Sequence, residues 1–169
     1  RDSAKLNYDF EEYFNLELLD GYGITETSTM VTMNWSGKER NMGSCGLPLP
    51  GMSVRIIDGN DLDVKPGEEG ELICRGPNVM IGYHKKKNET DKILKNGWYY
   101  TGDLAKQDLN GFITITGRLK EIIIRGGQNI SPTEVEEAIL KNPKILDCAV
   151  VGLKHSELGE IPAAFVILK

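Results

Sequence analysis

Short apolar runs separated by turn residues occupy the middle of the chain, and this spacing restricts the possible folds. Three runs of strand length follow one another: Val54–Ile57, Glu71–Arg75 and Phe112–Thr116. The turn signals between them are Asp58-Gly59-Asn60, Pro66-Gly67 and Asn110-Gly111. Asn-Gly before an apolar run is a strong hairpin signal. Strands this short and this closely spaced predict a small barrel or a twisted sheet from about residue 53 to residue 116.

A different pattern starts after Arg118. Ser131 can cap a helix and Pro132 suits its first turn, so a helix is predicted to run to Asn142-Pro143. Strands are expected around this helix at Glu121–Ile124, Cys148–Leu153 and Ala163–Leu168. A single helix covers one face of such a sheet, so we expect Lys169 to lie inside a larger lobe.

The fold class expected from these patterns is α+β. Residues 1–118 are predicted to form one part, which contains the distorted, barrel-like segment, and residues 119–169 a small α/β lobe. Within the first part we also expect a helix that ends at Phe14, a strand at Leu16–Leu19 and a short helix at Asn88–Leu94.

Composition and charge exclude several classes of function. Lys and Arg total 20 while Asp and Glu total 25, a net charge of −5. This balance does not favour nucleic acid, because phosphate neutralisation needs a clustered basic face. No apolar run reaches the length of about 18 residues that a membrane helix needs. Cys45, Cys74 and Cys148 are too few and too far apart for a disulfide framework or a zinc site, so a cytoplasmic location is expected.

Three glycine-containing motifs carry groups suited to a nucleotide. In Gly21–Glu26 an aromatic ring could stack on a base, and a hydroxyl and a carboxylate could meet a phosphate and its Mg²⁺. Asp103, at the end of an aromatic run, could accept hydrogen bonds from a ribose. Arg118 offers a planar fork of donors, and Gly126-Gly127 lets a narrow ligand pass the backbone. Each motif alone is equally well explained as a turn or a helix cap.

Taken together, the motifs resemble one family. The order GYGITET, GELICRG, YYTGD and GRLKEIIIRGGQNISPTEVE is similar to the later core motifs of the adenylate-forming superfamily. That superfamily includes acyl-CoA synthetases, firefly-type luciferases and peptide-synthetase adenylation domains. The resemblance covers about Leu16 to Lys169, and four ordered motifs are far more specific than one. It implies that residues 1–118 close a large adenylation domain and that residues 119–169 begin a small mobile domain.

The resemblance also implies roles for individual residues. Tyr22 would stack on adenine, Thr25 would bind the α-phosphate, Glu26 would bind Mg²⁺ and Asp103 would bind the ribose hydroxyls. The full set implied to bind ATP or AMP is Gly21, Tyr22, Gly23, Thr25, Asp103, Ile115 and Arg118. Lys120 is expected at the hinge between the two domains. Gly126 and Gly127 are expected to line the tunnel for the pantetheine of CoA.

The implied activity is that of an ATP-dependent acid–CoA ligase, whose partners are a small carboxylic acid, ATP and CoA. The family's phosphate loop is expected before Arg1 and its catalytic lysine beyond Lys169, so the chain alone is expected to be inactive. Two other functions stay open: a nucleotide-binding or scaffold module without catalysis, and an adenylation domain that serves a carrier protein. The motifs leave the identity of the acid and the oligomeric state open.

Overall fold

The computed structural model describes residues 3–169, and the chain divides into two compact units between Ile115 and Thr116. The division lies close to the boundary expected after Arg118, and the strand that contains Arg118 ends at that residue. The exact domain boundary stays a prediction. Among the described helices, none combines the length and the apolar character needed to cross a bilayer.

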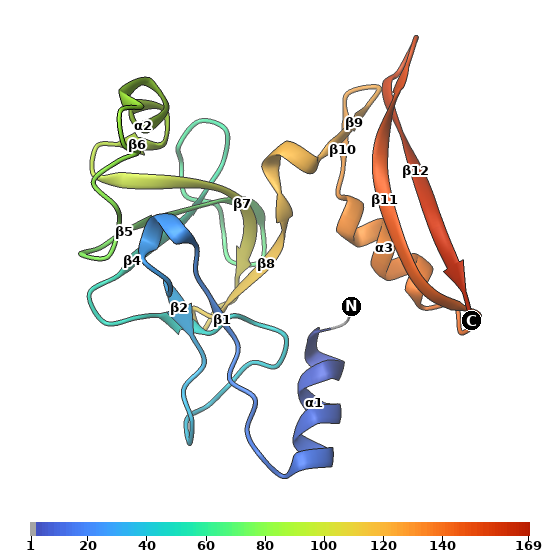
Figure 1. Cartoon of the computed structure of the whole chain (residues 1–169), viewed down its shortest axis with the longest axis horizontal. Helices are drawn as coiled ribbons and strands as arrows, with labels where there is room; N and C mark the ends of the chain where they lie inside the picture. The colour runs from blue at the N-terminus through green and yellow to red at the C-terminus, as the bar shows by residue number, and fades with distance from the viewer. Residues whose placement is uncertain (1–2) are drawn as a thin grey trace. The chain divides into compact units, whose positions relative to one another are not determined.

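The first unit is built mainly from antiparallel strands. Its helices are α1 (Ser3–Phe14), the 3₁₀ helix η1 (Thr25–Thr27) and α2 (Lys87–Ile93). Its strands are β1 (Gly21–Tyr22), β2 (Thr32–Met33), β3 (Leu47–Pro48), β4 (Ser53–Ile57), β5 (Glu69–Arg75), β6 (Leu94–Lys95) and β7 (Trp98–Gln107). The strand β8 (Ile113–Arg118) begins in this unit and pairs with β7. β1, β2 and β3 form a small sheet, and the larger sheet has the order β4-β5-β7-β6 (Figure 1).

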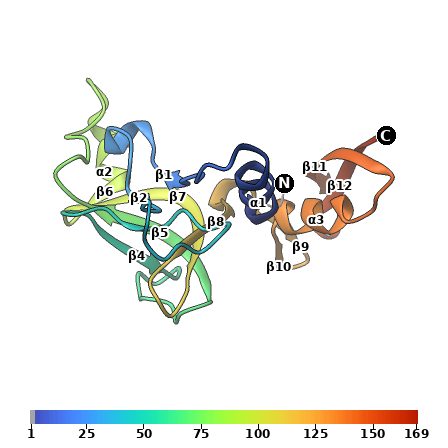
Figure 2. The same cartoon turned by 90° about the horizontal axis from the view of Figure 1, so that it is seen from below.

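The larger sheet confirms the expected β-rich segment. β5 lies between β4 and β7, and its successive residues Leu72, Ile73 and Cys74 are all buried. A central strand covered on both faces has this continuous apolar pattern. Ile113 and Val31, from other strands and loops, are fully buried as well. The sheet curls into a half-barrel, and in Figure 2 β7 runs from the side of β6 to the side of β8.

A bulge interrupts the pairing of β5 with β7. The pairing of β5 with β7 is regular on both sides of Leu72. Leu72 itself faces a segment of three residues, Thr101–Asp103, of β7. The Thr101 hydroxyl donates a 2.7 Å hydrogen bond to the Leu72 carbonyl, and Gly102 has a φ of +72° that glycine adopts readily. A bulge bends its strand and redirects the side chains that follow. The side chain of Asp103 therefore departs from the regular alternation of side chains between the two faces of the sheet.

The second unit contains the predicted capped helix and its strands. Its elements are η2 (Leu119–Glu121), β9 (Ile123–Arg125), β10 (Gln128–Ile130), α3 (Pro132–Leu140), β11 (Ile145–His155) and β12 (Gly159–Leu168). The strand order is β10-β9-β12-β11, all antiparallel, and α3 packs along β11 (Figure 1). The Ser131 hydroxyl accepts the N–H of Glu134 at 3.4 Å, which confirms the predicted N-cap.

Two predicted strands are corrected by the structure. Leu16–Leu19 is irregular, because side chains satisfy its backbone: the Leu18 N–H donates to Glu11 Oε1 at 2.9 Å, and the Leu18 carbonyl accepts from Arg40 at 3.2 Å. A segment whose polar groups are bonded in this way needs no neighbouring strand. The strand expected at Glu121–Ile124 starts only at Ile123, after the 3₁₀ turn of η2.

Candidate nucleotide-binding site

Two predicted site residues of the first unit are in direct contact. The Tyr22 hydroxyl donates a 2.6 Å hydrogen bond to Asp103 Oδ2, although 81 positions separate the two residues. Each residue is only 8% exposed. Burial, and then the hydrogen bond to Asp103, raise the pKa of Tyr22 far above its usual value. The hydroxyl therefore stays protonated as a donor, and the structure joins the motif around Tyr22 to the motif that ends at Asp103.

The bulge in β7 places Asp103 for this contact. The Asp103 N–H donates to Thr101 Oγ1 at 3.0 Å, and the Gly102 N–H donates to Glu71 Oε1 at 3.0 Å. These bonds fix the backbone of the bulge in place of the missing ladder bonds. Thr101 and Glu71 are supporting residues that our sequence reasoning did not assign. Both lie inside quoted motifs, YYTGD and GELICRG, which was the available signal.

Gly21 and Gly23 allow the chain to approach itself closely. A Cβ on Gly23 would lie 1.4 Å from the carbonyl oxygen of Thr29. A Cβ on Gly21 would lie 2.0 Å from Met30 Cε and 2.9 Å from the carbonyl oxygen of Thr32. Real Cβ atoms do not approach other atoms so closely, so both glycines are needed for the local fold. Their predicted part in an adenine pocket stays a prediction.

Thr25 and Glu26 project from a fixed turn. The buried Thr27 hydroxyl donates to the Ile24 carbonyl at 3.0 Å and accepts the Ile24 N–H at 3.3 Å, which closes the 3₁₀ turn. The Glu26 carbonyl accepts the N–H of Met80 at 2.7 Å. Thr25 is exposed and Glu26 is half-buried, so both side chains are accessible from a backbone held on two sides.

The chemistry of Glu26 suits a magnesium ion that a nucleotide also binds. Among residues 3–169, no group of three or more His, Cys, Asp or Glu side chains could hold an ion by itself. Mg²⁺ commonly takes one or two carboxylates and completes its shell with phosphate oxygens and water. A single accessible carboxylate therefore fits MgATP and does not fit a metal held by protein alone. The Tyr83 hydroxyl donates to Glu26 Oε1 at 2.6 Å, a contact that no sequence motif indicated.

The remaining predicted site residues lie at or near the start of the second unit. Ile115 is partly buried against the core of the first unit, whereas Arg118 and Lys120 are exposed. Gly126 and Gly127 form the turn of the β9–β10 hairpin, with φ values of +56° and +84°. The hairpin explanation of these glycines is thus correct locally. Their role in a CoA tunnel and the hinge role of Lys120 stay predictions.

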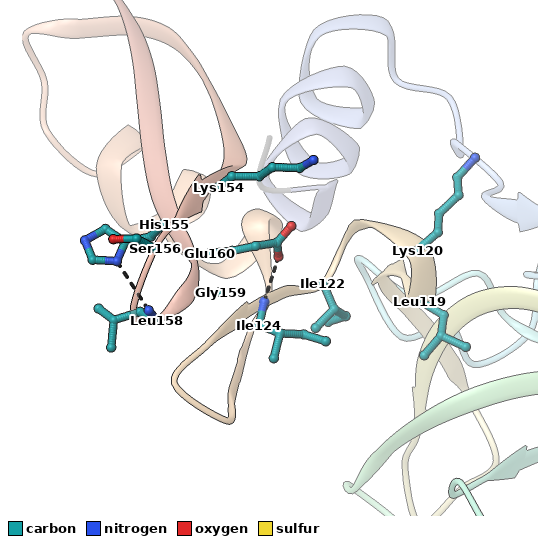
Figure 3. A pocket seen from close by; sticks show the side chains of 10 residues that line it. All are labelled: Leu119, Lys120, Ile122, Ile124, Lys154, His155, Ser156, Leu158, Gly159 and Glu160. Carbon is teal, nitrogen blue, oxygen red and sulfur yellow. Dashed lines mark hydrogen bonds between the residues drawn. The ribbon is translucent and has the colours of Figure 1, made fainter.

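An open pocket of about 740 Å³ lies beside η2 in the second unit (Figure 3). Lys120 lies on its wall, and Lys154 is the other cation among the lining residues. The Glu160 carboxylate accepts the N–H of Ile124 at 3.0 Å, so this acid is engaged with the backbone of β9. The lining residues are Leu119, Lys120, Ile122, Ile124, Lys154, His155, Ser156, Leu158, Gly159 and Glu160.

Known proteins match both units of the chain. The model of the AMP-binding enzyme family matches residues 3–84, and the model of the AMP-binding enzyme C-terminal domain matches residues 134–169. A long-chain-fatty-acid–CoA ligase of Escherichia coli is 41% identical over 152 residues, which are 90% of this chain and 27% of the relative. The chain thus spans about a quarter of the length of that relative.

Solved structures agree with these matches. ATP-bound MatB from Rhodopseudomonas palustris has a TM-score of 0.92 and 34% identity over 98% of this chain and 33% of its own. The o-succinylbenzoate CoA synthetase MenE from Bacillus subtilis, in complex with ATP and magnesium ion, has a TM-score of 0.80 and 31% identity over 95% of this chain and 33% of its own. With its ordered motifs and both family matches, the chain belongs to the AMP-binding, adenylate-forming enzyme family.

Proposed function

We propose that the chain is the nucleotide-holding part of an ATP-dependent acid–CoA ligase. The observation that supports this most directly is the buried hydrogen bond between Tyr22 and Asp103. It joins, in one place, two motifs that the resemblance assigns separately to adenine and ribose. The similar proteins include a long-chain-fatty-acid–CoA ligase, a CoA synthetase and ATP-bound MatB, which favours this activity over nucleotide binding alone.

In the first half-reaction, a carboxylate oxygen of the acid attacks the α-phosphorus of ATP, and the bond to pyrophosphate breaks. Negative charge builds up on the α-phosphate oxygens, so fixed donors there lower the barrier. The exposed Thr25 hydroxyl, on its fixed turn, is the donor we assign to this phosphate. Mg²⁺, when bound, neutralises phosphate charge, and Glu26 would hold it.

Asp103 holds the ribose in this proposal. A carboxylate has about four lone-pair sites, so it accepts from Tyr22 and also from sugar hydroxyls. Because Tyr22 occupies Oδ2 with a short bond, the orientation of the carboxylate is set before the nucleotide arrives. Such preorganisation lowers the cost of ordering the site on binding.

In the second half-reaction, the sulfur of CoA attacks the acyl carbon and AMP leaves. This step needs a different set of groups around the same adenylate, which a domain hinge can supply. We assign the hinge to Lys120, in the exposed 3₁₀ turn η2, and the passage of the pantetheine to the turn at Gly126 and Gly127.

The test is ATP–pyrophosphate exchange with a panel of acids, from short to long fatty acids and aromatic acids, on the complete protein that contains this chain. Exchange that depends on one acid class, followed by thioester formation with CoA, is the expected result. Thioester formation only with a carrier-protein pantetheine would show that the acceptor is a carrier protein and not CoA. ATP binding without exchange for any acid would contradict the ligase activity and favour a binding module.

A further inference from the structure

Tyr83 makes a direct contact with the candidate magnesium ligand. It lies in the loop between β5 and α2, and its hydroxyl donates a 2.6 Å hydrogen bond to Glu26 Oε1, 57 positions earlier in the chain. Both residues belong to the first unit. A hydrogen bond to a carboxylate is stronger than one between neutral groups, so this contact is expected to fix the orientation of Glu26.

The backbone of Tyr83 is anchored independently of Glu26. Its N–H donates to Thr90 Oγ1 at 2.9 Å, and its carbonyl accepts the N–H of Lys86 at 3.2 Å. The preceding residue, Gly82, has a φ of +145°, and a Cβ there would lie 2.7 Å from Thr90 Cγ2. The loop therefore packs against α2, and these contacts position the ring of Tyr83 beside Glu26.

We propose that Tyr83 is a positioning residue that holds the Glu26 carboxylate in the orientation needed to bind the magnesium ion of MgATP. Mg²⁺ requires near-ideal octahedral geometry, so a ligand in the wrong rotamer binds it poorly. Groups that hydrogen-bond to a metal ligand orient it, and their loss typically costs about 10- to 100-fold in metal affinity or activity. The inference rests on the proposed function, because it assigns a support to one residue of that site.

The variant that tests it is Tyr83→Phe in the complete protein, since phenylalanine keeps the ring and removes only the hydroxyl. The affinity for ATP is measured by calorimetry with Mg²⁺ and with the metal chelated. We expect MgATP binding to weaken about tenfold and metal-free ATP binding to stay unchanged. Tyr100→Phe is the matched control, because the Tyr100 hydroxyl also donates to a carboxylate, that of Asp61 at 3.1 Å, outside the candidate site.

A double variant separates positioning from general loosening of the loop. With Glu26→Gln already in place, Tyr83→Phe should weaken MgATP binding no further, because residues that act through one another are not additive. Equal losses with and without Mg²⁺, additive losses in the double variant, or behaviour like Tyr100→Phe would each overturn the role of Tyr83 while leaving the ligase proposal intact. If the unmodified protein does not bind MgATP, the proposed function fails and this inference with it.

Discussion

The Tyr22 hydroxyl and the Asp103 carboxylate form a 2.6 Å hydrogen bond in the interior of the first unit. We expect Asp103→Asn to weaken ATP binding, because the amide keeps the shape of the side chain and removes its charge and half of its acceptor capacity. The loss should be about 1–3 kcal/mol, roughly 5- to 150-fold in the dissociation constant. Isothermal titration of the complete protein measures it.

Asp61→Asn is the control for this change, since Asp61 also accepts a tyrosine hydroxyl but lies on an exposed turn. It should leave ATP affinity unchanged. Equal affinities in Asp103→Asn and Asp61→Asn would remove Asp103 from the ribose site.

Gly102→Ala should destabilise the bulge of β7. A Cβ at this position would meet no atom within 4 Å, so the cost comes from the φ of +72° alone. We expect a loss of about 1–2 kcal/mol in the free energy of unfolding, together with weaker ATP binding as Asp103 shifts. Calorimetric melting compared with Gly59→Ala, which is open in space and has no such φ, isolates the backbone effect. Equal melting temperatures for Gly102→Ala and Gly59→Ala would contradict backbone strain at position 102.

Lys120→Pro should impair one half-reaction far more than the other. Proline fixes φ near −65° and restricts Leu119 before it, so a backbone that must change conformation at η2 is held in one state. If that state is the adenylating one, pyrophosphate exchange survives and thioester formation is lost. Lys120→Ala is the control for loss of the side chain. Equal losses in both half-reactions, measured on folded protein, would show that Lys120 is not the hinge.

Arg40 should make the stability of the first unit sensitive to acid. Its hydrogen bond to Glu11 lowers the pKa of that carboxyl below the usual value of 4.5. A carboxylate with a lowered pKa in the folded chain stabilises the fold above its unfolded pKa. That stabilisation is lost as the pH falls through the folded pKa. Arg40→Met should therefore lower the melting temperature at neutral pH, with the difference from the unmodified chain shrinking in acid.

Melting curves from about pH 3 to pH 7 test this expectation. Lys5→Met is the matched control, because Lys5 pairs with Asp9 on the same helix at an exposed position, where an ion pair contributes little. A melting difference for Arg40→Met that persists unchanged at low pH would assign Arg40 a packing role instead.

Local signals in the sequence predicted part of the fold, but the ten-residue strand β7 was not among the expected strands. The turn at Asn110-Gly111, the cap at Ser131 and the apolar run of β5 depend on neighbouring residues alone, and all three are confirmed. The strand predicted at Leu16–Leu19 was wrong, because the backbone of this segment hydrogen-bonds to the side chains of Glu11 and Arg40, which no local pattern reveals.

In the candidate site, too, the sequence indicated some residues, whereas others are found only through the tertiary structure. Ordered motifs indicated Tyr22 and Asp103, but not that one donates to the other. Tyr83 had no signal, because it stands in a loop beside a basic run and meets Glu26 only through the tertiary fold. Supporting residues of this kind depend on distant contacts, so sequence reasoning without a structure does not reach them.

The 81-position span between Tyr22 and Asp103 has a consequence for how this unit assembles. Closing so long a loop costs chain entropy, whereas the pairs β6–β7 and β7–β8 need only short turns and can form earlier. We therefore expect the hydrogen bond to form late in folding, after the sheet and the segment around Tyr22 have met. A nucleotide that needs this pair would recognise only fully assembled molecules and would stabilise them by mass action. ATP binding would then measure the fraction of completely folded molecules, whereas the secondary structure of the sheet would also be present in partly folded ones.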